Sequence, residues 1–182
     1  MRTTHTKHAL AAALAGVLMA VVSPAIAHAR STQSSDPTTQ SIQAEAWWIK
    51  NYKSGKVLDA LSSANGAKVV QLTKATNVGL QNWFTILDEP YWSFENFESG
   101  LNLGIDGAST SVGAAAITAT GSSNSNQDWT EDFSDYSGDY FALKNRKSGL
   151  CLGVSNASTL DGAQILQFTC DGTANQGWIL TH

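Results

Sequence analysis

The sequence predicts an all-β domain made of three repeated units, each with four short strands. Two motifs recur at matching positions. A Gln-x-Trp tripeptide ends at Trp83, Trp129 and Trp178, and a Ser-Gly pair lies upstream of each, at residues 54–55, 99–100 and 148–149. The glutamine follows the serine by 27, 28 and 28 residues in the three units. Motifs that keep their spacing in this way indicate an internal repeat.

The strands are expected from short apolar segments bounded by turn residues. In the first unit these segments are residues 46–52, 56–61, 67–73 and 82–87. A turn signal separates the middle two strands of each unit, namely Asn65-Gly66, Val112-Gly113 and Asp161-Gly162. Asn-Gly and Asp-Gly are typical of hairpins because both residues tolerate positive φ. No segment after residue 29 keeps a helical period for long, which favours an all-β fold.

The number of units decides between two architectures. The repeats span about residues 46–88, 91–133 and 140–181, within one domain at 46–182. Four-stranded units of about this length also form propeller blades, but a propeller needs at least about four blades to close. Three units around a pseudo-threefold axis can close a sheet without leaving open edges. We therefore predict a closed pseudo-threefold domain.

The first 29 residues are predicted to be a secretory signal peptide. A short basic head carries Arg2 and Lys7, and an apolar run follows from Ala9 to Val22. That run is too short to span a bilayer comfortably, and it leads into the small-residue pattern Ala-His-Ala at 27–29. We expect cleavage before Arg30, with the earlier Ala-Ile-Ala at 25–27 as the alternative site. Residues 30–45 are predicted to be a flexible polar leader, and the protein is predicted to be secreted without a membrane span.

Composition excludes several functional classes. Beyond residue 29 the chain has nine basic and fifteen acidic residues, a net charge of −6 with no basic run, which disfavours nucleic-acid binding. His182 is then the only histidine. A Ser-His-Asp or Cys-His nucleophile needs an internal imidazole, and a histidine-based zinc site needs at least two. We therefore expect no catalytic residues, metal site or cofactor, and no enzymatic activity.

Two further groups of residues allow a structural interpretation. Cys151 and Cys170 are an even pair in a chain predicted to be exported, which indicates a disulfide. An acidic connector between the second and third units holds Glu131, Asp132, Asp135 and Asp139. Clustered oxygen ligands could bind calcium, and paired carboxylates could serve a glycosidase. The spacing matches no known calcium loop, so a solvated linker is the favoured interpretation.

Three copies of Ser-Gly-x-x-Leu followed by Gln-x-Trp resemble the ricin B-type lectin domain, a β-trefoil. The resemblance covers Ala46 to Thr181. It implies that each unit supplies two strands to a six-stranded barrel and two to a hairpin cap. It also implies a bridge between Cys151 and Cys170, because the family pairs cysteines 19 positions apart at this place. The three motif tryptophans are expected to bury apolar surface near the barrel axis, with the glutamine amides satisfying nearby backbone groups.

The resemblance also implies one shallow sugar pocket per unit. Each pocket combines an acid after the Leu, an aromatic residue on the third strand, and the Asn and Gln of Asn-Gln-x-Trp. No unit of this chain is complete. The residues carried over are Asp59 and Gln81 in the first unit, Asn126 and Gln127 in the second, and Phe168, Asn175 and Gln176 in the third. The departures are Leu72 and Leu80 in the first unit, Gly104 and Ala119 in the second, and Gly153 in the third.

Each candidate residue also has a structural interpretation. Asp59 could cap a turn, Phe168 could belong to the core, and the asparagines could serve loop geometry. Asp106 and Asn156, shortly after the two glycines, could stand in for the missing acids. We expect a non-catalytic carbohydrate-binding module with a glycan or polysaccharide ligand. The alternative is a protein-binding trefoil such as a toxin subunit, an assembly adaptor or a protease inhibitor. The sugar, the active repeat and the oligomeric state stay open.

Overall fold

The computed structural model describes residues 45–182, so the predicted signal peptide and nearly all of the predicted leader lie outside the described residues. The first unit contains β1 (Ala46–Asn51), β2 (Val57–Ala60), β3 (Val69–Leu72) and β4 (Trp83–Asp88). The second contains β5 (Tyr91–Asn96), β6 (Asn102–Ile105), β7 (Ala116–Ala119) and β8 (Trp129–Asp132). The third contains β9 (Phe141–Asn145), β10 (Cys151–Val154), β11 (Ala163–Phe168) and β12 (Gly177–Thr181). The only helices in 45–182 are short 3₁₀ turns, at Gly79–Gln81, Asp106–Ala108, Ser125–Gln127, Ser155–Ala157 and Ala174–Gln176.

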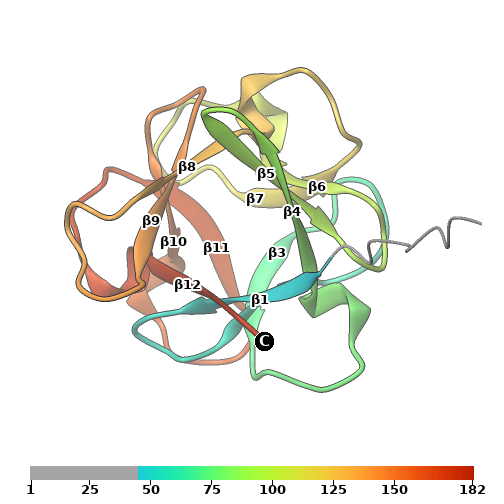
Figure 1. The fold of residues 1–182 in the computed structure, drawn as a ribbon, viewed down its shortest axis with the longest axis horizontal. Coiled ribbons are helices and arrows are strands. Elements are labelled where there is room, and N and C mark those ends of the chain that lie inside the picture. Colours follow the sequence, from blue (N-terminus) through green and yellow to red (C-terminus); the bar gives the residue numbers. More distant parts are fainter. Residues whose placement is uncertain (1–44) are drawn as a thin grey trace, which may run out of the picture. The chain divides into compact units, whose positions relative to one another are not determined.

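The first and fourth strands of the three units form one closed barrel. Strand β1 pairs with β4, β4 with β5, β5 with β8, β8 with β9, β9 with β12, and β12 returns to β1. All six pairings are antiparallel, and the closed ring leaves no barrel edge unpaired. Figure 1 shows the three units arranged around a common axis, with the C-terminal strand β12 beside β1. The predicted β-trefoil fold is therefore confirmed.

The second and third strands of each unit form the cap. The hairpins are β2–β3, β6–β7 and β10–β11. The cap strands also pair between units, since Ala163 in β11 lies opposite Gln71 in β3. Isolated bridges join Lys68 to Ile117 and Ala115 to Leu166. The cap is therefore a ring of interlocked hairpins, in which each unit touches its neighbour.

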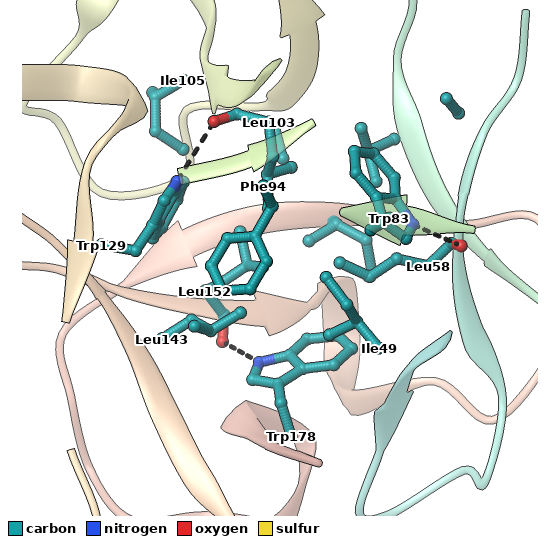
Figure 2. Packing of buried hydrophobic residues seen from close by; sticks show 14 of the residues in the cluster. Ile49, Leu58, Trp83, Phe94, Leu103, Ile105, Trp129, Leu143, Leu152 and Trp178 are labelled. Atoms are coloured by element: carbon teal, nitrogen blue, oxygen red, sulfur yellow. Dashed lines mark hydrogen bonds between the residues drawn. The ribbon is translucent and has the colours of Figure 1, made fainter. Parts of the chain in front are cut away.

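Three tryptophans at equivalent positions fill the core. Trp83, Trp129 and Trp178 are completely buried. Each indole N–H donates to a backbone carbonyl of its own unit's second strand, namely that of Leu58, Leu103 or Leu152. Figure 2 shows the three indoles around a central group formed by Ile49, Phe94 and Leu143, which are also fully buried. Burial of this apolar surface is the main stabilising contribution of the repeat.

A buried asparagine at the end of each first strand explains why Asn recurs before the Ser-Gly pair. The side-chain oxygen of Asn51 accepts hydrogen bonds from the backbone N–H groups of Lys53 and Ser54. Its amide nitrogen donates to the carbonyls of Asn175 and Gly177. Asn96 and Asn145 make the equivalent contacts in the other units. Each asparagine thus ties one tight turn to the Gln-x-Trp segment of the preceding barrel strand.

The predicted hairpin turns differ from the expectation. Only the glycines, Gly66, Gly113 and Gly162, have positive φ (84°, 83° and 79°); their preceding residues do not. The cap loops are also longer than a tight hairpin allows, because β2 ends at Ala60 and β3 begins at Val69. The glycine N–H instead donates to the cap strand of another unit, as from Gly66 to Thr118 O at 2.8 Å. These turns therefore fasten one unit to the next.

Two predicted links between segments can be compared with the structure. The Cys151–Cys170 disulfide is present, with the two Cα atoms 5.0 Å apart. The acidic connector is not simply a solvated linker, because Tyr136 packs on Gly177 and its hydroxyl donates to Thr173 O at 3.1 Å. Burial and then the neighbouring carboxylates raise the pKa of Tyr136 to about 12.

Within residues 45–182 no helix is long and apolar enough to cross a membrane.

Candidate functional site

The third unit brings its three predicted site residues together. Phe168, Asn175 and Gln176 line one pocket of about 430 Å³ on the side of the cap. Asn156 also lines it, held by a left-handed backbone with φ of 53°. Asp171, which the sequence analysis did not single out, contributes a carboxylate to the same wall. The pocket thus combines an aromatic ring, three side-chain amides and an acid.

Phe168 is placed as a pocket wall. Its side chain is partly exposed and lies outside the buried core cluster. Gly153 makes room for it, because a Cβ added to that glycine would lie 3.1 Å from Phe168 Cδ2 and 3.0 Å from Gln176 Cγ. An acid at position 153 would therefore need its neighbours to shift.

The three glutamines of the repeat serve the backbone. Gln176 Nε2 donates to Thr169 O at 3.0 Å, and its Oε1 accepts from Asp171 N at 3.3 Å. Gln81 and Gln127 close the equivalent loops in the same way. All three side chains are at most 3% exposed. The structure therefore gives the glutamines a loop-closing role, with little of their surface open to a ligand.

Asn175 keeps its donor available. Its side-chain amide lies 2.9 Å from the hydroxyl oxygen of Thr173, which holds the amide in the pocket wall. Its side-chain nitrogen donates to none of the residues in 45–182. Asp171 Oδ1 accepts from the same hydroxyl at 2.6 Å and from Thr173 N at 3.0 Å, which holds the carboxylate in place.

A comparison between units shows a second available donor, the backbone N–H of Thr169. In the first unit the equivalent Thr73 N–H donates to Asp161 Oδ1 at 2.7 Å. In the second unit Thr120 N–H donates to Asn65 Oδ1 at 2.9 Å. Each acceptor comes from the cap turn of another unit, one residue before the positive-φ glycine.

For Thr169 of the third unit, the corresponding turn residue is Val112 of the second unit, and the valine side chain has no acceptor. Gly113 is fastened in the same manner as its equivalents, by N–H donation to Gln167 O at 2.8 Å, so Val112 occupies the same place. It lines the third-unit pocket beside Thr169, and its side chain is 60% exposed. No residue in the described part of the chain accepts the Thr169 N–H. Among the described residues this donor is therefore free.

The second unit has a smaller pocket of about 320 Å³, lined by Asn126 and Gln127. Ala119 gives it no aromatic wall, and the side chain of Asn65 reaches in from the first unit. Asn126 is only 7% exposed and its Nδ2 donates to Ile105 O at 3.4 Å, which leaves its Oδ1 buried without a partner. Asp106 does not line the pocket, so the suggestion that it replaces the missing acid is not supported.

The first unit keeps its acid but buries it. Asp59 is only 4% exposed. Burial raises the pKa of its carboxyl, and the neighbouring Gln81 amide lowers that pKa in part. Leu80, in place of the family's asparagine, packs against the hydrophobic core. Asp59 and Gln81 are therefore adjacent, as expected, but they lie beneath the surface.

The acidic connector gives no metal site within residues 45–182, where no group of three or more His, Cys, Asp or Glu side chains is placed to share an ion. Burial raises the pKa of Glu131, whereas hydrogen bonds from Ser134 lower the pKa of Asp132. The two carboxyls lie in a surface hollow with Lys144 and Arg146. Arg146 is already paired with Asp128 at 3.0 Å.

Comparison with known proteins identifies the family. Residues 132–182 match the family model described as "Ricin-type beta-trefoil lectin domain-like". The designed threefold-symmetric protein ThreeFoil is 35% identical, with a TM-score of 0.71; the match covers 75% of this chain and 98% of that one. The chain belongs to the ricin-type β-trefoil lectin family.

Two further solved structures are similar to the chain. An exo-β-1,3-galactanase from Clostridium thermocellum is 32% identical over 75% of this chain, with a TM-score of 0.70, and the match covers 30% of that enzyme. A Macrolepiota procera ricin B-like lectin, solved in complex with lactose, is 20% identical, with a TM-score of 0.65 over 79% of this chain and 99% of that one. At that identity the likeness shows the fold alone. No curated protein matches the sequence.

Proposed function

We propose that this ricin-type lectin domain binds a saccharide in the pocket of its third unit. The observation that carries the proposal is that this pocket combines a partly exposed ring, Phe168, with two available N–H donors, at Thr169 and Asn175. A sugar presents an apolar C–H face and several hydroxyls, so it can pack on the ring while its oxygens accept from the donors. Asp171 supplies an acceptor for a hydroxyl proton.

The second and first units are weaker candidates for physical reasons. The second lacks the ring and has its backbone donor capped by Asn65. The first holds a buried acid and an apolar Leu80 where an amide would be needed. A single shallow site makes few contacts to offset the ordering of the ligand, so a monosaccharide should bind near the millimolar range, roughly. Retention on a polymer would then depend on several sites engaging together.

The experiment is a titration of the protein with a saccharide panel, with Asn175→Ala as the test variant. Galactosides head the panel, including lactose and β-1,3-linked galactan, because the similar structures include a lectin in complex with lactose and an exo-β-1,3-galactanase. Asn175→Ala should abolish binding, since the amide donor is lost without opening a core cavity. The matched control is Asn126→Ala, which alters the equivalent residue of the second unit. Equal loss in both variants, or no binding by the parent, would contradict the proposal.

We further propose that the protein acts outside the cell, after removal of residues 1–29. The basic head, apolar run and Ala-His-Ala pattern support export. A disulfide between Cys151 and Cys170 fits an oxidising compartment. N-terminal sequencing of protein from the culture medium should begin at Arg30. Protein that keeps Met1 or stays in the membrane fraction would overturn this proposal.

A further inference from the structure

A second hollow lies beside the Gln-x-Trp loop of the first unit. It has a volume of about 430 Å³, equal to that of the third-unit pocket. Its walls include Trp48, Asn77, Gly79, Asn82, Phe97 and Glu98, none of which lines the pockets of the second and third units. We call it the Trp48 hollow. It joins β1 and the loop before β4 with the turn that follows β5.

The residues of the Trp48 hollow depart from the threefold pattern together. Trp48 precedes the central Ile49, where the other units have Ser93 and Ala142. Phe97 follows the buried asparagine, where they have Tyr52 and Arg146. The loop of the first unit is also one residue longer, since Gln81 lies nine positions after Leu72, whereas the equivalent interval in each of the other units is eight. Asn77 in this loop takes a left-handed conformation with φ of 62°.

Gly79 allows the two sides of the hollow to approach. A Cβ added there would lie 2.5 Å from Glu98 Oε2 and 3.3 Å from Phe97 Cδ1. The equivalent residues of the other units, Ser125 and Ala174, both carry a side chain. Among the three units, the loop that contains Gly79 is therefore the one that lies this close to an acid and an aromatic ring of the following turn.

The hollow also holds polar groups without partners. Trp48 Nε1 and Asn82 Oδ1 are buried and make no hydrogen bond within the described residues. One is a donor and the other an acceptor, and an unpaired buried polar group costs free energy. The Lys74 ammonium covers one face of the Trp48 ring, 3.4 Å from its centroid. Phe97 stays 53% exposed at the rim, and its ring lies 5.4 Å from that of Phe84.

We propose that the Trp48 hollow is a second saccharide site, built from side chains that the family pocket does not use. The exposed face of Phe97 suits the C–H face of a neutral sugar ring. The carboxylate of Glu98 accepts hydroxyl protons. The indole N–H of Trp48 and the amide oxygen of Asn82 lie buried behind this wall, so they gain partners only where the ligand displaces the atoms that cover them. The site thus lies between the Gln-x-Trp loop of the first unit and the turn that follows β5 of the second unit.

The test is a titration of the ¹⁵N-labelled protein with galactose, glucose, mannose and N-acetylglucosamine, followed through side-chain N–H resonances. The indole signal of Trp48, assigned with Trp48→Phe, should shift with at least one of these sugars. Phe97→Ala should weaken that response about tenfold, while shifts of the Asn175 amide stay unchanged. Glu98→Gln should weaken it with the fold intact. Phe133→Ala is the matched control, because this phenylalanine is similarly exposed (48%) and lies outside the hollow.

The outcomes separate this proposal from the one for the third unit. A sugar that shifts only the Asn175 amide would sustain the third-unit site and overturn the Trp48 site. A sugar that shifts only the Trp48 indole would do the reverse. Trp48 shifts that persist in both Phe97→Ala and Glu98→Gln would also overturn the Trp48 site, because the walls named here would not then hold the ligand.

Discussion

Replacing Val112 with asparagine should close the backbone donor of the third-unit pocket. In the other units the equivalent Asn65 and Asp161 accept the threonine N–H at 2.9 and 2.7 Å. Gly113 is anchored as its equivalents are, so an asparagine at 112 should reach Thr169 N–H in the same way. The ligand would then lose one hydrogen bond, a net contribution of about 0.5–1.5 kcal/mol. That corresponds to a roughly 2- to 10-fold weaker affinity.

The assay is a calorimetric or NMR titration of the parent, Val112→Asn and Val112→Ala with the best-binding sugar. Val112→Ala is the control, because it removes the valine side chain without adding an acceptor. Position 112 is 60% exposed, so either change should alter the free energy of unfolding by no more than about 0.5 kcal/mol. The reasoning is refuted if Val112→Asn protects the Thr169 amide from exchange and binding is nevertheless unchanged. Equal weakening by both variants would refute it too.

Three further predictions concern stability. Asp59→Asn should raise the melting temperature at pH 7. Burial raises the native pKa of this carboxyl, so its ionisation opposes folding at neutral pH; the penalty shrinks as pH falls below the native pKa and is gone below the pKa of the unfolded chain. A gain that persists below pH 4, roughly, would be inconsistent with this cause. Trp178→Ala should lower the free energy of unfolding by about 3–5 kcal/mol in denaturant titrations, and a small loss would mean that the indole is not core. Reducing the Cys151–Cys170 bridge should cost about 3 kcal/mol, and an unchanged melting temperature under reductant would show that the bridge is absent.

The fold could be predicted because the residues that define it repeat in sequence. Each Trp of Gln-x-Trp fills the same place in the core, and each Asn before Ser-Gly makes the same turn. Such local signals survive without knowledge of the tertiary structure. The gathering of Phe168 and Asn175 in one pocket was predicted for the same reason, since both positions lie at fixed places in the repeat.

The rest depends on contacts between units, which a repeat pattern does not contain. Val112 affects the third-unit pocket because the cap loop of the second unit reaches across to it. The sequence shows Val112 beside Gly113, but it does not show that Thr169 is the group left uncapped. The packing of Tyr136 on Gly177 likewise depends on the path of the connector. The burial of Asp59 is likewise an effect of packing, which the spacing of the motif does not contain.

The most direct test of the central claim is a ¹H–¹⁵N titration that follows the Thr169 backbone amide and the Asn175 side-chain amide. If the third unit binds saccharide as proposed, both signals should shift together along one binding curve when a galactoside is added. The equivalent Thr120 and Thr73 amides, already capped by Asn65 and Asp161, should stay in place. Binding that moves Thr120 or Thr73 while Thr169 and Asn175 stay unchanged would contradict the account.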